Sequence, residues 1–357
     1  MTHRMVVGAL VLSVGAFWTP TAHFSPLPLR SAFTARRSGV VVDSFWSQAL
    51  GIRKHVVMWL PPSYASDRGR RYPVAYYLHG AFGDETNWTR LGHLDATLDS
   101  LTRAGMPEMM VVMPDGDDGF YTTWNFLGDY NACRRAHAAG TNTEPAATYC
   151  VPWPHYDDYI ARDLVAYVDK NYRTLADRRH RGIAGLSMGG YGAVALALSY
   201  PDVFSAAASH SGVLAPLVGA RAAGDTSSGY PYDLDSLEAS YGKALGALFP
   251  GPFGRDTAAW LARDPSRLAM HLQREWPSLR PMLHIDCGLD DRFLAQSRAF
   301  KASAEKLGWT IDYAEYPGAH TWDYWRSHSV ESARWLANLI ATGKREGERG
   351  KSEGATR

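Results

Sequence analysis

The sequence carries almost no net charge. Its 357 residues include 37 lysines and arginines against 36 aspartates and glutamates, which gives a formal net charge of +1. A chain so balanced lacks the excess of positive charge with which proteins bind nucleic acid or an anionic membrane surface. With 46% apolar and 20% charged residues, it has the composition of an ordinary globular protein, long enough for one large domain or two small ones.

Fingerprints of cofactors and metals are also missing. The sequence has no phosphate-binding loop and no dinucleotide-binding glycine pattern, so we predict no cofactor. Asp115, Asp117 and Asp118 crowd one loop, but they lack the length and spacing of an EF-hand loop. We therefore predict no metal site.

Long hydrophobic runs are scarce, and the one that stands out lies at the N-terminus. Residues 5–18 form a short apolar run after Arg4, and small and turn-forming residues follow it. This pattern is typical of a secretory signal and is too short for a comfortable membrane span. We predict a signal peptide over residues 1–24, a linker over 25–39 and a secreted or periplasmic protein without a stable membrane span. An uncleaved anchor is the alternative, because no neat A-x-A cleavage site is present.

Cysteine is rare, with three residues in the whole chain. Cys133 and Cys150 flank a polar loop and could form a disulfide, which would stabilise the fold by roughly 3 kcal/mol through the smaller entropy of the unfolded chain. Two free thiols are the alternative. Cys287 lies in a predicted core strand, where we expect it to act as a small buried hydrophobic residue.

The most informative pattern that is present lies at residues 182–192. Its centre, Gly185-Leu186-Ser187-Met188-Gly189, is a G-x-S-x-G pattern, which is weak evidence by itself. A short apolar run precedes it, typical of a buried strand, and a stretch with helical spacing follows it to residue 200. A serine on such a strand–turn–helix unit has a strained backbone and an exposed hydroxyl. We take Ser187 as the candidate nucleophile, and a plain glycine-rich turn is the alternative.

Short apolar segments alternate with helical patterns along the chain. The expected strands cover residues 40–45, 55–60, 72–78, 108–113, 181–186, 205–209, 281–287 and 309–316. The longest expected helices cover 156–172 and 330–340. The alternation predicts an α/β fold with a mainly parallel central sheet and helices on both faces. We assign one domain to residues 40–342, with insertions at about 117–155 and 212–279, and predict a disordered tail over 343–357.

A serine nucleophile needs a base, and the base needs an acid that orients it. His320 follows the last predicted strand and is our candidate base, although a lone loop histidine is more often an ordinary surface residue. His210 also follows a strand, but it precedes every plausible acid. Asp291 is our candidate acid and Asp290 the reserve, whereas Asp286 falls within a strand and is less able to reach the imidazole.

The developing oxyanion needs backbone N–H donors. One should come from Met188, directly after the nucleophile, and the other from Ala81, with Phe82 as second choice, in the turn that follows the strand at 72–78. Aromatic residues near these loops could form a substrate-binding wall, and ordinary packing is the alternative for each. These aromatic candidates are Phe82, Tyr121, Trp124, Tyr191 and Trp322.

With these residues in place, the chain resembles the esterase D / putative esterase family of α/β-hydrolases. That family includes feruloyl and acetyl-xylan esterases, S-formylglutathione hydrolases and antigen 85 mycolyltransferases. The likeness covers about residues 40 to 342 and rests on segments 78–80, 113–116, 120–124, 171–173, 185–190, 318–322 and 324–325. The resemblance implies an α/β-hydrolase fold, a triad of Ser187, Asp291 and His320, and an oxyanion hole made by the N–H groups of Ala81 and Met188.

These observations predict a secreted serine carboxylesterase that acts through an acyl-enzyme on Ser187. Candidate substrates are small or polysaccharide-linked feruloyl, acetyl or other short acyl esters. An acyltransferase of antigen 85 type, which moves the acyl group to a sugar or lipid alcohol, is the alternative. A non-catalytic binding module is disfavoured by the complete Ser–Asp–His set. The two insertions depart from the family pattern, and we expect them to shape the acyl or alcohol pocket. The export signal argues against the cytosolic S-formylglutathione branch.

Overall fold

The computed structural model describes residues 39–124, 130–139, 146–219 and 234–343. The predicted signal peptide, the predicted linker up to residue 38 and the predicted tail from residue 344 lie outside the described residues. Within the described ranges, no helix combines the length and the apolar character needed to cross a membrane.

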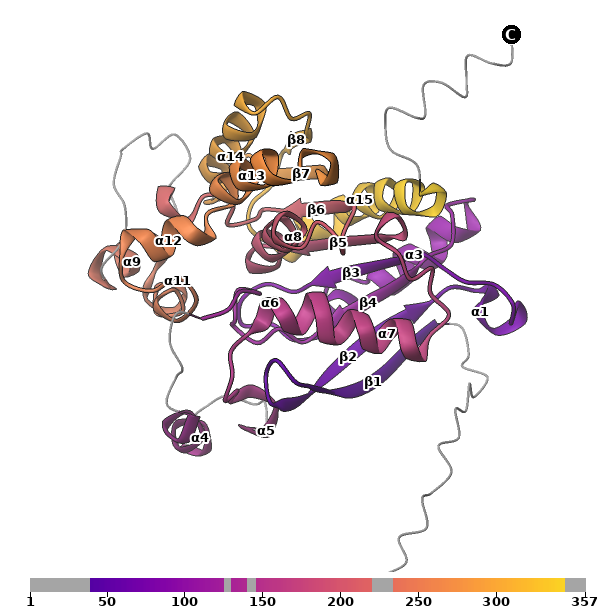
Figure 1. Cartoon of the computed structure of the whole chain (residues 1–357), viewed down its shortest axis with the longest axis horizontal. Helices are drawn as coiled ribbons and strands as arrows, with labels where there is room; N and C mark the ends of the chain where they lie inside the picture. The colour runs from indigo at the N-terminus through magenta and orange to yellow at the C-terminus, as the bar shows by residue number, and fades with distance from the viewer. Residues whose placement is uncertain (1–38, 125–129, 140–145, 220–233, 344–357) are drawn as a thin grey trace, which may run out of the picture. The chain divides into compact units, whose positions relative to one another are not determined.

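Eight strands form one sheet in the order β1-β2-β4-β3-β5-β6-β7-β8 (Figure 1). The strands are β1 (Gly39–Ser47), β2 (Ile52–Leu60), β3 (Val74–Leu78), β4 (Met110–Pro114), β5 (Arg181–Leu186), β6 (Ala206–His210), β7 (Met282–Gly288) and β8 (Asp312–Tyr316). β2 pairs antiparallel with β1 and β4, and all other pairs are parallel. Each of the eight predicted strands is present, with ends shifted by a few residues at most.

The middle of the sheet is buried on both faces, which explains its unbroken apolar strands. Every residue of β3, β4, β5 and β6 is buried. Successive side chains alternate between two core clusters, so Tyr76 lies in one and Tyr77 in the other. The edge strand β1 has one open face, on which Val40, Val42 and Trp46 are exposed.

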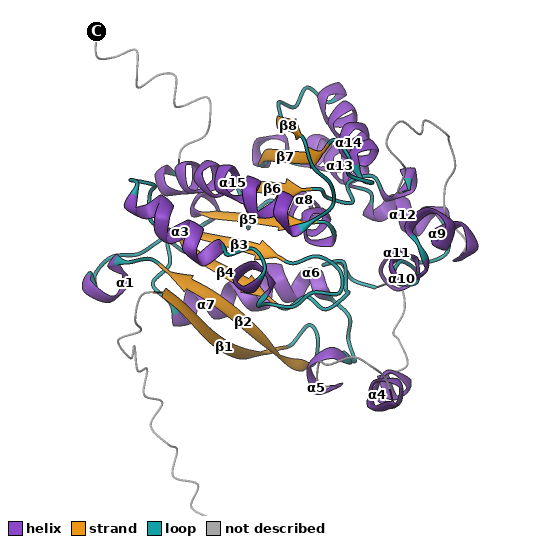
Figure 2. Cartoon of the chain, turned by 180° about the vertical axis from the view of Figure 1, so that it is seen from behind, coloured by secondary structure: helices purple, strands orange, loops and turns teal. Residues whose placement is uncertain are grey.

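Helices cover both faces of the sheet. One face, in front in Figure 1, carries a first group: α6 (Tyr156–Asp158), η1 (Tyr159–Leu164), α7 (Val165–Asn171), α8 (Met188–Ser199), α13 (Pro265–Glu275) and α14 (Leu294–Lys306). The other face, seen in Figure 2, carries α3 (Leu94–Arg103) and α15 (Trp322–Thr342). The short elements are α1 (Ser63–Ser66), α2 (Asn87–Arg90), α4 (Tyr130–Ala139), α5 (Ala146–Tyr149), η2 (Arg178–His180), η3 (Pro216–Val218), α9 (Leu234–Tyr241), α10 (Lys243–Gly246), α11 (Pro250–Phe253), α12 (Thr257–Arg263) and η4 (Pro277–Leu279).

Two helices differ from the sequence prediction. The closing helix begins at Trp322 rather than at residue 330, because Tyr324 and Trp325 pack into the core cluster beside β5 and β6. Aromatic residues are only moderate helix formers, so this packing decides the start of the helix. The segment predicted as one helix over 156–172 contains the π-helical turn η1, which buries Tyr159, Ile160 and Ala161 in succession.

The predicted disulfide between Cys133 and Cys150 is present and joins α4 to the residue after α5. Both helices lie in the predicted insertion at about residues 117–155. Cys287 is buried in β7, and burial raises the pKa of its thiol above the ordinary range.

Candidate active site

Ser187 occupies the sharp turn between β5 and α8. Its backbone has φ 54° and ψ −118°, a region that residues with a Cβ rarely adopt. Three backbone hydrogen bonds hold it there. Its N–H donates to the carbonyl of His210 at 2.9 Å, and its own carbonyl accepts from the N–H of Tyr191 at 3.0 Å and from that of Val213 at 3.3 Å. A Cβ on Gly185 would overlap the backbone of Gly189, so the flanking glycines permit the turn.

A histidine and an aspartate complete a hydrogen-bonded chain with this serine. Nε2 of His320 lies 2.9 Å from Oγ of Ser187, and Nδ1 lies 2.9 Å from Oδ2 of Asp291. An ionised carboxylate can only accept, so Nδ1 carries the proton and Nε2 of the neutral imidazole accepts from the serine hydroxyl. The second oxygen of Asp291 accepts from the N–H of Phe293 at 2.8 Å, which fixes the carboxylate.

Aromatic rings flank the imidazole of His320. The ring of Phe293 lies edge-on at 4.9 Å between centroids, and that of Trp325 lies edge-on at 4.8 Å. These contacts restrict rotation of the imidazole and hold Nε2 toward Ser187. The His320 side chain remains 23% exposed, so a substrate can reach it.

The two other aspartates considered from the sequence lie elsewhere. Asp290 is exposed, and its backbone N–H donates to the carbonyl of Gly318. Asp286 lies within β7 and approaches two different imidazoles, with Oδ2 2.6 Å from Nδ1 of His210 and 3.4 Å from Nε2 of His284. Of these three aspartates, the structure therefore brings only Asp291 to His320.

The turn at residues 79–83, which we call the oxyanion turn, follows β3 beside the serine. A Cβ on Gly80 would lie only 3.3 Å from Cβ of Ser187. The N–H of Phe82 already donates to Oδ1 of Asp118 at 2.7 Å. Within the described residues, the N–H of Ala81 has no acceptor, and neither has that of Met188, the first residue of α8. The geometry leaves these two donors free for a ligand oxygen and occupies the reserve donor, Phe82.

The aromatic candidates separate into buried and accessible residues. Tyr121 and Tyr191 are each 1% exposed, and their hydroxyls donate to the backbone carbonyls of His79 and Arg263. Both therefore lie in the core and do not line an open surface.

The other aromatic candidates can be reached from outside. Phe82 is 63% exposed at the oxyanion turn. Trp124 lines a cavity, and Trp322 is half-buried and packs edge-on against Trp88 and Trp325.

A cavity of about 400 Å³ lies between the two predicted insertions. Such a volume falls within the range of small-molecule sites. Its lining is largely aromatic and apolar, with residues that include Trp124, Tyr130, Tyr149, Tyr156 and Leu248. The charged residues of the lining are Asp117, Asp118, Glu238 and Arg255. Asp118 lines the cavity and also accepts the N–H of Phe82, so this one residue contacts both the cavity and the oxyanion turn. Among the described residues, Ser187 and His320 do not belong to the lining.

A buried ionic cluster lies beside this cavity, and the sequence analysis missed it. The ammonium group of Lys54, wholly buried in β2, contacts both Asp115 and Asp117. Burial and the charge of Asp115 raise the pKa of Asp117 to about 7. Burial alone would raise the pKa of Asp115, but the charge of Lys54 and the contacts with His79 together outweigh it, and the pKa falls. In the sequence, the one available signal is strand alternation, which places Lys54 on the same buried face as Ile52 and Val56.

A second, buried cluster contains the same three residue types as the hydrogen-bonded set of Ser187, His320 and Asp291. Nε2 of His210 lies 2.9 Å from Oγ of Ser332, and Nδ1 lies 2.6 Å from Asp286. We set His210 and Asp286 aside in the sequence analysis, and no sequence signal distinguishes Ser332, which lies inside α15. Across the described ranges, no group of three histidines, cysteines or acidic residues is arranged to hold a metal ion.

The sheet order, the turn at Ser187 and the loops after β7 and β8 define an α/β-hydrolase fold. The chain belongs to the family described as "Putative esterase", because the sequence model of that family matches residues 47–336. An esterase of Mycobacterium tuberculosis is 32% identical over 170 residues, which are 47% of this chain and 31% of that protein.

Two further similarities are more distant. A combined endo-1,4-beta-xylanase and feruloyl esterase of Xylanibacter ruminicola is 27% identical over 165 residues. These residues are 45% of this chain and 20% of that protein. The aligned parts are therefore less than a third of these relatives' lengths. The solved structure of a ferulic acid esterase superimposes with a TM-score of 0.62 at 23% identity, covering 85% of this chain and all of that one, which shows the shared fold.

Proposed function

We propose that this chain is a serine carboxylesterase with Ser187 as nucleophile, His320 as general base and Asp291 as the acid that orients it. The observation that carries the proposal is the position of one imidazole, 2.9 Å from the serine hydroxyl and 2.9 Å from a buried carboxylate. Family membership supports the same reaction class.

The geometry supports an acyl-enzyme mechanism. Nε2 of His320 takes the proton of Ser187 as Oγ attacks the ester carbonyl, and Asp291 stabilises the imidazolium that forms. The N–H groups of Ala81 and Met188 donate to the tetrahedral oxyanion. Nε2 then gives its proton to the leaving alkoxide. Water, deprotonated by the same nitrogen, attacks the acyl-enzyme carbonyl. As the bond from that carbonyl to Oγ breaks, Nε2 returns the proton to Ser187 and the acid is released.

The cavity between the insertions supports a substrate that extends beyond the reacting ester. Feruloyl, acetyl or other short acyl esters, free or linked to polysaccharide, are the proposed substrates. The disulfide supports export to a secreted or periplasmic location, because disulfides persist in oxidising compartments.

Acyl transfer is the second candidate function, and one observation favours it. The cavity that could hold an acceptor alcohol is lined by Asp118 and Glu238, whose carboxylates can accept hydrogen bonds from hydroxyl groups. Product analysis with added trehalose or glycerol separates the two functions. A new ester would support transfer, and undiminished hydrolysis without a new ester would exclude these two acceptors.

The test of the leading proposal is hydrolysis of p-nitrophenyl acetate, butyrate and octanoate and of methyl ferulate by the wild type and Ser187→Ala. We expect kcat to fall by a factor on the order of 10⁶ in the variant, to the limit of detection, because the nucleophile is lost. The preferred ester identifies the acyl class. Equal activity of the two proteins would refute the proposal.

A further inference from the structure

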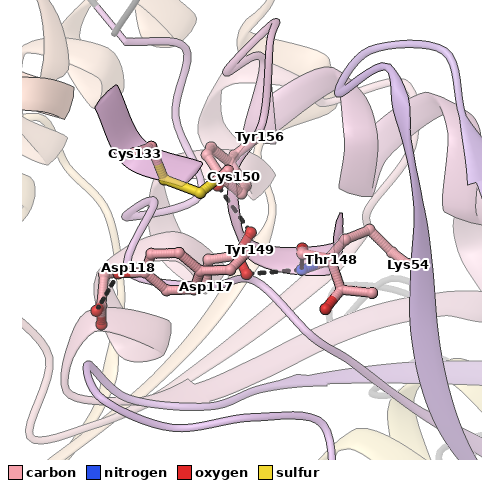
Figure 3. Close-up of a disulfide and its surroundings, with 8 residues drawn as sticks. All are labelled: Lys54, Asp117, Asp118, Cys133, Thr148, Tyr149, Cys150 and Tyr156. Carbon is pink, nitrogen blue, oxygen red and sulfur yellow. Dashed lines mark hydrogen bonds and ion pairs between the residues drawn. A yellow bond between two sulfur atoms is a disulfide. The ribbon is translucent and has the colours of Figure 1, made fainter. Parts of the chain in front are cut away.

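Asp118 connects the disulfide-closed segment to the oxyanion turn. Its Oδ1 accepts the N–H of Phe82 at 2.7 Å, and its Oδ2 accepts the hydroxyl of Tyr149 at 3.3 Å. Tyr149 directly precedes Cys150, one half of the disulfide, as Figure 3 shows. One carboxylate thus joins two segments that the sequence separates.

The oxyanion turn needs an external partner to keep its shape. Phe82 has φ 63°, a left-handed conformation that costs a residue with a Cβ about 1–2 kcal/mol. Its ring is 63% exposed, so packing does little to hold it. Inside the turn, the carbonyl of Gly80 accepts from the N–H of Gly83 at 3.2 Å and from Nδ1 of His79 at 2.8 Å, and neither bond reaches Phe82. The charge-assisted bond from Phe82 to Asp118 is shorter and acts directly on the strained residue.

The loop that carries Asp118 also forms hydrogen bonds with the first residue of this turn. We call residues 115–121 the aspartate loop. Its Gly116 N–H donates to Nε2 of His79 at 2.8 Å, and its Tyr121 hydroxyl donates to the carbonyl of His79 at 3.1 Å. His79 is the first residue of the oxyanion turn. The aspartate loop therefore holds both the start of the turn and, through Asp118, its strained centre.

The aspartate loop is itself anchored in the protein interior. Asp117, the neighbour of Asp118, accepts from the ammonium of Lys54 at 2.7 Å and from the hydroxyl of Tyr156 at 2.8 Å (Figure 3). The hydroxyl of Tyr159 donates to the carbonyl of Asp115 at 2.9 Å. Because its neighbours are buried and bonded, Asp118 projects from a rigid base.

We propose that Asp118 is a positioning residue for the oxyanion hole. Its carboxylate fixes the N–H of Phe82, and with it the peptide plane beside Ala81, so that the N–H of Ala81 points at the carbonyl oxygen above Ser187. The inference rests on the proposed function, since Ala81 matters only if Ser187 attacks an ester. Oxyanion donors act in the transition state, so a displaced turn lowers kcat and leaves KM nearly unchanged.

The test compares Asp118→Ala, Asp118→Asn and the surface control Asp202→Ala with the wild type. A fluorophosphonate titration counts active sites, and p-nitrophenyl acetate then gives kcat per site and KM. We expect Asp118→Ala to lower kcat by about 10- to 100-fold with KM within about twofold. Asp118→Asn should keep kcat within about threefold, because its amide oxygen still accepts from Phe82. Asp202, an exposed partner of Arg162, should have no effect.

The outcomes separate this inference from the proposed function. Loss of activity in Ser187→Ala together with unchanged kcat in folded Asp118→Ala would overturn the inference and leave the esterase standing. Activity in Ser187→Ala would overturn the proposed function itself. If Asp118→Ala does not fold, Asp118→Glu decides: it keeps the charge but moves the carboxylate by one methylene, so a wild-type kcat there would overturn the inference.

Discussion

The molecule contains two clusters of serine, histidine and aspartate with nearly the same distances. In the accessible cluster, His320 lies 2.9 Å from both Ser187 and Asp291. In the buried cluster, His210 lies 2.9 Å from Ser332 and 2.6 Å from Asp286. Distances alone therefore do not distinguish a reactive site from a structural one.

The direction of the hydrogen bond at the serine differs between the clusters. Ser332 donates its hydroxyl proton to the carbonyl of Ser329 at 3.2 Å, so Nε2 of His210 must donate to Oγ of Ser332. Ser187 donates to its histidine instead, as a nucleophile must. The lesson is that the role of the imidazole depends on where the serine proton goes.

Access and backbone geometry differ as well. Ser332, His210 and Asp286 are each fully buried inside the fold. Ser187 stands at a strained turn beside the N–H groups of Ala81 and Met188, which have no acceptor among the described residues. The buried cluster still serves the accessible one, because the carbonyl of His210 accepts the N–H of Ser187. Under the proposed function, the accessible cluster reacts and the buried cluster helps to hold it in place.

The largest effect on kcat should come from removing the histidine of the accessible cluster, whereas a change in the buried cluster should affect stability. We expect His320→Ala to lower kcat for p-nitrophenyl acetate by a factor on the order of 10⁴ to 10⁶ without loss of stability. Ser332→Ala should keep kcat but lower the free energy of unfolding by about 1–3 kcal/mol, because Nε2 of His210 loses its acceptor. Steady-state kinetics and urea unfolding measure both effects. A folded Ser332→Ala protein without activity would erase the distinction between the clusters.

A smaller effect should distinguish the neighbouring aspartates of the accessible cluster. Asp291→Asn should lower kcat by a factor on the order of 10³ to 10⁴, since an amide supports the wrong tautomer of His320. Asp290→Asn should stay within about twofold of the wild type, because this side chain is exposed. Kinetics of the two variants side by side decide the matter, and the reverse ranking would make Asp290 the acid.

The smallest effect concerns acid stability and the buried cluster. Burial favours protonation of Asp286, but the neighbouring His210 and His284 together outweigh it and lower the pKa of that carboxyl. A lowered pKa in the folded state stabilises the protein above the unfolded pKa of about 3.9, and this contribution is lost as the pH falls further. We therefore expect the free energy of unfolding to fall less between neutral and acid pH in Asp286→Asn than in the wild type. Asp323→Asn, at an exposed position, should follow the wild type, and identical curves for all three proteins would contradict the assignment.

Much of the fold could be predicted from local sequence. A sheet covered on both faces needs apolar strands, and these were visible in the sequence. The strained turn at Ser187 was predicted from the glycines that flank it, and its backbone angles confirm it. The predicted start of the last helix, at residue 330, was wrong. α15 begins at Trp322, because Tyr324 and Trp325 pack against the sheet. Tyr121 and Tyr191 could not be told apart from accessible aromatics, because their burial depends on distant segments.

The candidate site shows the same division. The order of Ser187, Asp291 and His320 along the chain suggested a triad, yet the sequence left Asp290 open as the acid. The sequence also suggested no function for Asp118, whose two partners lie 36 and 31 residues away. Contacts over such separations leave no periodic pattern to recognise.

The sequence by itself determined the alternation of strands and helices and the strained turn at Ser187, because both depend on residues close together in the chain. Tertiary structure alone decided which imidazole meets that serine. His320 lies 133 residues from Ser187, and only the shared edge of parallel strands brings them together. His210, much closer in the chain, is turned instead into the core, where Asp286 and Ser332 bind it.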